Sequence, residues 1–195
     1  MTVTINRVYD SYWQAEQAVS KLKAIGIPES DISLVANRHV SSQHKNVTDG
    51  DAVASSAGIG ATVGGGAGLL AGIGILAIPG LGPVVAAGWL AATAVGAIGG
   101  AAVGGVVGAL VNAGVPEADA HVYSESIRRG ATMVTVRCEP GHEPMVRGAL
   151  DSLSPVDVSL RRLEYQKTGW KKFDPAAPEY PLTEAELERA RRRNF

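Results

Sequence analysis

Hydrophobic and polar residues alternate near the start of the chain in the order that predicts a strand, a helix and a second strand. Val3–Tyr9 has the period-two alternation of a strand. Ser11 and Gln14 have the spacing of a capping box at the start of a helix, and Gly26 is a residue type that often ends one. The apolar residues of this helix fall on one face: Ala15, Ala18, Val19, Leu22 and Ile25. The second strand alternates at Ile32, Leu34 and Ala36, which completes a βαβ unit.

Similar patterns return after residue 113. Pro116 begins a predicted helix that ends at Gly130, and Glu125 is placed to pair with Arg129 one turn later. A strand is predicted from the alternation of Thr132, Val134, Val136 and Cys138. A helix face follows at Met145, Val146, Ala149, Leu150 and Leu153, and a last strand at Val156, Val158 and Leu160. The combined order, β-α-β-β-α-β, predicts an α+β protein with a ferredoxin-like split domain.

A long uncharged insertion separates the two halves of this domain. Residues 52–116 hold no charged side chain. Glycine recurs there at every fourth position in two runs: Gly60, Gly64, Gly68 and Gly72, then Gly96, Gly100, Gly104 and Gly108. A four-residue stride lies on one face of an α-helix, so each run predicts a stripe of bare backbone. The turn between the runs is marked by Pro79, Gly80, Gly82 and Pro83, which a helix does not cross.

The insertion predicts a glycine-zipper helical hairpin that spans a membrane. Residues 53–78 and 84–111 would each be roughly 40 Å long as helices, and a bilayer core needs about 20 residues. Glycine costs about 1 kcal/mol in a helix in water, whereas small residues let helices approach closely in lipid. The predicted partners are therefore the lipid bilayer and further copies of the chain, as a homo-oligomer. Two alternatives stay open: a Gly/Ala-rich helical pair buried in a soluble oligomer, and an apolar linker.

Charges around the insertion predict its orientation. Arg38 and Lys45 precede it, Arg128 and Arg129 follow it, and the turn between the runs has no charge. The positive-inside rule then predicts the cytoplasmic (inner) membrane as the location, with both termini cytoplasmic.

The chain accordingly divides into four parts. Residues 1–51 form the first half of the α+β domain with a polar loop, 52–113 the helical hairpin, and 114–165 a helix with the second half of the domain. Residues 166–195 form a tail with a proline-containing linker and a charged helix, which the capping box of Thr183 and Glu186 begins. We expect this last helix to be solvated or to dock on a partner.

Charge and candidate chemistry argue against catalysis and against nucleic-acid binding. The 18 basic and 19 acidic residues give a net charge of −1, so no long-range field attracts nucleic acid. The single cysteine, Cys138, alternates with apolar residues and is expected in the core. The histidines lack a metal-ligand spacing: His39, His44, His121 and His142. Gly66-Ala67-Gly68-Leu69-Leu70-Ala71 fits a relaxed dinucleotide pattern, but the acid that should follow it is missing. We expect no enzyme activity, no cofactor and no metal.

Two segments resemble the bacterial general stress protein family. The first runs from Val8-Tyr9-Asp10 through Ala15-Glu16-Gln17-Ala18-Val19 to Gly26-Ile27-Pro28. The second is Gly114-Val115-Pro116-Glu117-Ala118-Asp119-Ala120, with Tyr123 and Arg128-Arg129-Gly130 before a valine-rich strand. Members of that family join a βαβ start to a glycine-rich apolar middle. The resemblance extends over residues 3–165 and implies a stress-associated bacterial protein without an assigned enzyme activity or catalytic residues.

Two functional hypotheses follow from these observations. The first is a non-enzymatic, membrane-anchored assembly and interaction protein that oligomerises through its glycine faces. The second is a soluble oligomeric sensor or carrier, in which a Gly/Ala-rich helical core binds a small or apolar ligand. Membrane pelleting of the intact chain separates them.

Overall fold

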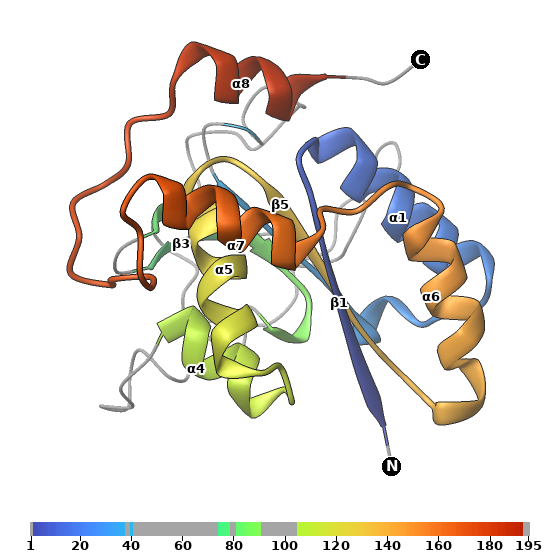
Figure 1. Ribbon diagram of the computed structural model, residues 1–195. Helices are drawn as coiled ribbons and strands as arrows, with labels where there is room; N and C mark the ends of the chain where they lie inside the picture. Colours follow the sequence, from blue (N-terminus) through green and yellow to red (C-terminus); the bar gives the residue numbers. More distant parts are fainter. Residues whose placement is uncertain (1, 38–39, 41–73, 79–80, 91–104, 193–195) are drawn as a thin grey trace.

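A five-stranded antiparallel sheet with helices on both faces forms the centre of the molecule (Figure 1). The computed structural model describes residues 2–37, 40, 74–78, 81–90 and 105–192. The strands are β1 (Val3–Tyr9), β2 (Ile32–Asn37), β3 (Gly74–Ile78), β4 (Gly82–Ala87) and β5 (Thr132–Cys138). Their order across the sheet is β1-β5-β2-β4-β3. The protein is therefore of the α+β class.

The predicted βαβ start is confirmed. Helix α1 (Tyr12–Ala24) follows β1, and the 3-10 turn η1 (Glu29–Asp31) leads into β2. Ser11 and Gln14 form the capping box, and the Gln14 side chain accepts a hydrogen bond from the Ser11 backbone N–H at 3.3 Å. Gly26 ends the helix with a φ of 87°, a conformation that glycine adopts without steric penalty.

The elements predicted after the insertion are confirmed as far as residue 151. They are α5 (Glu117–Arg128), β5 and α6 (Glu143–Asp151); the 3-10 turn η2 (Pro140–His142) between β5 and α6 is an additional element. β5 pairs with β1 on one side and β2 on the other, and Cys138 is buried on it. The predicted face of α6 is correct for Val146 and Leu150, which are buried, and wrong for Met145, which is 43% exposed.

The predicted last strand at Val156, Val158 and Leu160 is wrong. Helix α7 (Val158–Lys167) begins there because the Asp157 side chain accepts hydrogen bonds from the first backbone N–H groups of the helix. One trace of strand pairing remains before the helix, since the Val156 backbone N–H donates to the Val8 carbonyl at 2.7 Å. Beyond that bond, the chain turns away from the edge strand β1.

The helical hairpin predicted over the insertion is also wrong at residues 74–78 and 82–87. Residues 74–78 and 82–87 are the strands β3 and β4. Gly82 and Pro83 are the first two residues of β4 and pair with the end of β3. A fully buried strand is apolar on both faces, so its sequence resembles that of a buried helix. Helix α4 (Gly105–Asn112) does continue the predicted second helix and includes Gly108. In the described ranges, no helix has the length and apolar character needed to cross a bilayer.

Each face of the sheet covers its own hydrophobic core. Helices α1 and α6 pack over the core that contains Tyr9, Leu22 and Val134. Helices α4 and α5 cover the opposite core, together with Phe173 from the chain after α7 (Figure 1). The described parts of the insertion belong to this second core, in which Leu81 and Leu110 are buried.

The tail does not extend freely into solvent but folds back over the domain. We call residues 168–192 the C-terminal strap; its helix α8 (Glu184–Arg191) begins with the predicted Thr183–Glu186 capping box. Phe173 inserts into the second core, and Ala190 inserts into the first beside α1. The strap therefore contributes side chains to both cores and contacts both faces of the sheet.

Candidate functional site

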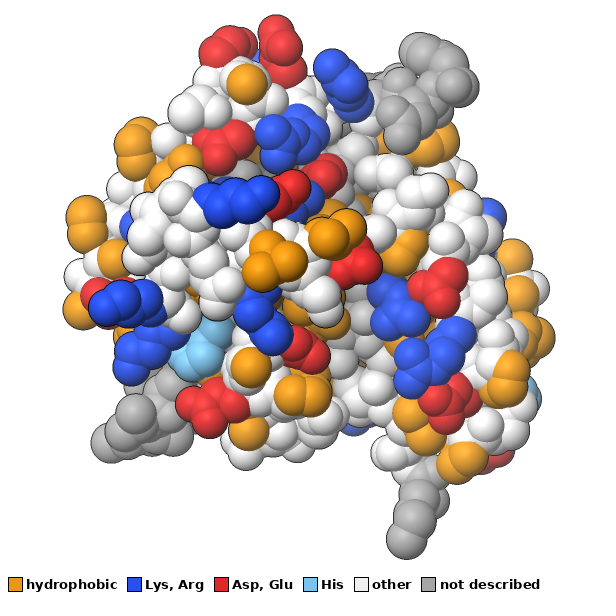
Figure 2. Space-filling view, in the orientation of Figure 1, with side chains coloured by type: hydrophobic (Ala, Val, Ile, Leu, Met, Phe, Trp, Pro, Cys, Tyr) orange, Lys and Arg blue, Asp and Glu red, His pale blue; other side chains and the backbone are white. Residues whose placement is uncertain are grey.

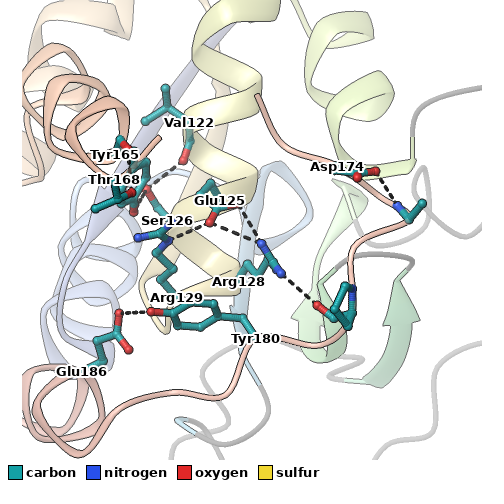
Figure 3. A network of polar contacts seen from close by, with 12 residues as sticks. Val122, Glu125, Ser126, Arg128, Arg129, Tyr165, Thr168, Asp174, Tyr180 and Glu186 are labelled. Atoms are coloured by element: carbon teal, nitrogen blue, oxygen red, sulfur yellow. Dashed lines mark hydrogen bonds and ion pairs between the residues drawn. The ribbon is translucent and has the colours of Figure 1, made fainter. Parts of the chain in front are cut away.

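A fully buried carboxylate lies at the centre of a polar network that joins α5, α7 and the C-terminal strap (Figure 3). The side chain of Glu125 on α5 is 1% exposed. Arg129 Nε donates to its Oε1 at 2.6 Å, and Arg128 Nη1 lies 3.4 Å from its Oε2. A carboxylate removed from water requires such pairing, because an isolated buried charge is strongly unfavourable.

The sequence of α5 explains how this network is positioned. Glu125, Arg128 and Arg129 are spaced three and four residues apart, which places them on one face of the helix. The two arginines lie at the end of the helix, where the macrodipole favours positive charge. Gly130 then stops the helix with a φ of 92°, and a Cβ there would lie 3.2 Å from Leu182 of the strap.

The arginines use their remaining surface to hold the strap. Arg128 Nη2 donates to the Pro178 carbonyl at 2.8 Å. The guanidinium carbons of Arg128 and Arg129 lie 5.5 and 5.2 Å from the centroid of the Tyr180 ring. The Tyr180 hydroxyl donates to Glu186 Oε1 at 3.1 Å, which links this contact to the start of α8 (Figure 3). The network is thus a clasp between α5 and the C-terminal strap.

Tyr165 of α7 closes the other side of the clasp. The Arg129 guanidinium stacks on its ring at 4.4 Å, and its hydroxyl lies 3.1 Å from Ser126 Oγ. Ser126 Oγ donates to the Val122 carbonyl at 2.8 Å, so the phenol is the donor between these two hydroxyls. Burial raises the pKa of the Tyr165 phenol, and the positive charges of Arg161 and Arg129 oppose this increase. Tyr165 therefore stays neutral and keeps its proton for this hydrogen bond.

Two further ion pairs fix α7 beside the clasp. Arg161 Nη2 lies 2.8 Å from both carboxylate oxygens of Asp10, at the end of β1. Arg162 pairs with Asp119 in the first turn of α5. Burial acts to lower the pKa of the Arg161 guanidinium, but Asp10 and Tyr165 together outweigh burial and the pKa is raised overall. These pairs hold α7 between the edge of the sheet and α5.

The clasp is suited to holding segments together rather than to accepting a substrate. Both oxygens of Glu125 face guanidinium groups, and those groups already contact aromatic rings or a carbonyl of the strap. Across the described ranges, no cluster of three or more His, Cys, Asp or Glu side chains could hold a metal ion. His121 lies 3.7 Å from Glu117 on α5, and His142 is exposed in η2.

The residues predicted to pack in an oligomer lie mostly outside the described structure. Gly108 is described, on α4, and of the predicted turn Gly82 and Pro83 are described at the start of β4. The others lie outside the described residues: Gly60, Gly64, Gly68, Gly72, Gly96, Gly100, Gly104, Pro79 and Gly80.

One ion pair of the clasp is predictable from the sequence, but the extent of the clasp is not. The spacing of Glu125 and Arg129 predicted their ion pair, but not their burial. Tyr180 and Phe173 were the available signal, since aromatic residues in a proline-containing segment favour docking over a free linker.

A comparison with protein-family models, with curated proteins and with solved structures finds no match to this chain.

Proposed function

We propose that the protein is a non-enzymatic assembly protein, in which the α+β domain brings two glycine-rich runs together for association with further copies. Its association with stress rests on the family resemblance alone. The observation that carries the proposal is the pairing of β3 with β4, in which Gly74 lies opposite Ala86. The first glycine run ends at Gly72, two residues before β3, and the second begins at Gly96, nine residues after β4, so the hairpin lies between the two runs in the sequence.

Glycine at every fourth position supports association between helices. A stripe without side chains lets two backbones approach closely, which strengthens van der Waals contact and weak Cα–H hydrogen bonds. Glycine is unfavourable in a solvated helix by about 1 kcal/mol per residue, so such a stripe is best stabilised when another helix covers it. Further copies of the chain supply an identical stripe.

The sheet topology favours an assembly that does not cross a bilayer. Each glycine-rich segment begins and ends in the same domain, so a segment that crossed a membrane would have to return. Two crossings need about 40 apolar residues. Residues 41–73 and 91–104 are only 33 and 14 residues long in all, and the first of these segments also contains polar and charged residues. We therefore propose the oligomeric form of the assembly, with the bilayer-anchored form as the competing outcome of the test.

Fractionation of the untagged chain, followed by native mass spectrometry, tests the proposal. We expect oligomers without detergent and release of the chain from membranes by alkaline carbonate. Pelleting that resists carbonate would support the bilayer-anchored form and contradict the oligomeric one. A monomer in both conditions would contradict assembly altogether.

A further inference from the structure

Helix α7 presents two leucines to solvent on the same face. Leu160 and Leu163 are 61% and 54% exposed, and their spacing places them on neighbouring turns. The other large hydrophobic residues with comparable exposure in the described ranges, Val111 and Met145, lie on different helices. Figure 2 shows apolar side chains gathered over α7 with acidic and basic side chains around them.

Opposite charges stand at the two ends of this face. Asp157 precedes the helix, and one of its oxygens accepts hydrogen bonds from Ser159 and Leu160. Lys167 is the last residue of the helix, and within the described ranges no ion-pair partner approaches it.

The remaining charges of α7 are already compensated within the chain. Arg161 pairs with Asp10 and, through Nε at 3.2 Å, with Glu164. Arg162 pairs with Asp119. The exposed face therefore has two leucines at its centre, a negative charge at one end and an uncompensated positive charge at the other.

We propose that α7 is a self-complementary docking surface and that its occupant is α7 of a second copy of this chain. An antiparallel arrangement about a twofold axis near the middle of the helix places Leu160 against the partner's Leu163, and Asp157 against the partner's Lys167. A twofold interface uses each contact twice, and antiparallel helices also align their macrodipoles favourably.

The charge pattern discriminates between orientations. A parallel arrangement brings Asp157 against the partner's Asp157 and Lys167 against the partner's Lys167, and like charges in contact are unfavourable. One short helix on each side buries less surface than a standard interface of about 1,600 Å², so we expect a dimer that dissociates on dilution.

This contact goes beyond the proposed assembly and is independent of it. The glycine runs flank the β3–β4 hairpin in the sequence, whereas α7 comes after α6, near the end of the domain. A chain with both contacts would form larger assemblies, and a chain with α7 alone would stop at dimers. One contact can therefore fail in an experiment while the other holds.

Cross-linking of the full chain tests the orientation directly. Asp157 and Lys167 are ten residues apart in one helix, or about 15 Å, so a zero-length carbodiimide cross-link between them cannot form within one chain. In an equal mixture of ¹⁴N- and ¹⁵N-labelled chains we expect this cross-link to join light and heavy peptides. Cross-links from Lys167 only to other carboxylates would overturn the antiparallel contact.

A dilution series of the full chain tests the leucines. Leu160→Ser combined with Leu163→Ser should raise the dimer dissociation constant roughly tenfold or more. Met145→Ser, which removes an exposed apolar residue from α6, should leave the dimer dissociation constant unchanged. A melting temperature equal to that of the parent shows that each variant is folded. Equal effects of the two changes, or none from the leucine pair, would overturn the proposal. Loss of larger assemblies in Gly64→Leu with dimers retained would support the α7 contact and the glycine runs separately.

Discussion

Arg129 Nε and the carboxylate of Glu125 lie 2.6 Å apart on consecutive turns of α5, with the carboxylate fully buried. On an exposed helix such a pair contributes about 0.3–0.5 kcal/mol. Here the carboxylate is buried and the rings of Tyr165 and Tyr180 lie against the Arg129 guanidinium, so solvent screens the interaction less than on an exposed helix. The surroundings therefore turn a common surface motif into a contact on which the packing of α5, α7 and the strap depends.

Removal of the Glu125 carboxylate should strongly destabilise the protein. Glu125→Ala leaves two clustered guanidinium groups without a counter-charge and should lower the free energy of unfolding by about 3 kcal/mol. The matched control is Glu143→Ala, which removes an exposed i, i+4 pair with Arg147 of nearly the same length, 2.7 Å. The control should change stability by less than about 1 kcal/mol. Urea unfolding followed by circular dichroism measures both, and equal values would contradict the role assigned to burial.

The hold on the strap should depend on the ring of Tyr180 more than on its hydroxyl. Tyr180→Phe loses the hydrogen bond to Glu186 but keeps the ring in contact with the two arginines, at a cost of about 1 kcal/mol or less. Tyr180→Ala also loses the cation–π contacts, each contributing about 0.5–2 kcal/mol. Hydrogen exchange of residues 173–183 should therefore accelerate much more in Tyr180→Ala. Equal acceleration of hydrogen exchange in both variants would show that the hydroxyl, not the ring, keeps the strap in place.

Local signals in the sequence were sufficient for α1, α5 and β5, because their caps and apolar periods lie within each element. They failed at Val158, where alternating apolar residues favoured a strand and the cap formed by Asp157 decided for a helix. They failed again at β4, since Val84, Val85, Ala86 and Ala87 are all buried and carry no period. The clasp depends on Tyr180, which is 51 residues from Arg129 in sequence, and no local pattern reports such a contact.

Gly88 should tolerate no side chain. It has a φ of 90°, and a Cβ there would lie 2.1 Å from the Ile32 carbonyl oxygen and 2.6 Å from Ser33 Oγ. Gly88→Ala should thus separate the end of β4 from β2 and lower the melting temperature by several degrees. Gly148→Ala on α6 is the control, because a Cβ there meets open space, and it should stabilise by about 0.5–1 kcal/mol. Equal melting temperatures for Gly88→Ala and the parent would contradict the close approach.

Alkaline pH should destabilise the fold through its buried tyrosines. Burial raises the pKa of Tyr12 to about 12 from an ordinary value of 10.0. The folded state then keeps a proton that the unfolded state releases, so stability is unaffected below pH 10 and falls as pH rises from 10 towards 12. Absorbance at 295 nm follows phenol ionisation, and Tyr12→Phe should reduce the late-titrating part. Titration of every tyrosine near pH 10 in the folded protein would contradict this burial.

The glycine runs should matter by position rather than by composition. If Gly64, Gly68, Gly100 and Gly104 line helix contacts, Gly→Leu at any of them should disrupt the assembly, since a leucine side chain prevents close approach of two backbones. Ala71→Leu and Ala97→Leu add the same side chain off the stripes and should have milder effects. Native mass spectrometry of the full chain measures the oligomers, and thermal unfolding checks the α+β domain. A general hydrophobic attraction would strengthen in all these variants, because each adds apolar surface. Equal behaviour at stripe and off-stripe positions would therefore show that the glycine spacing does not direct assembly.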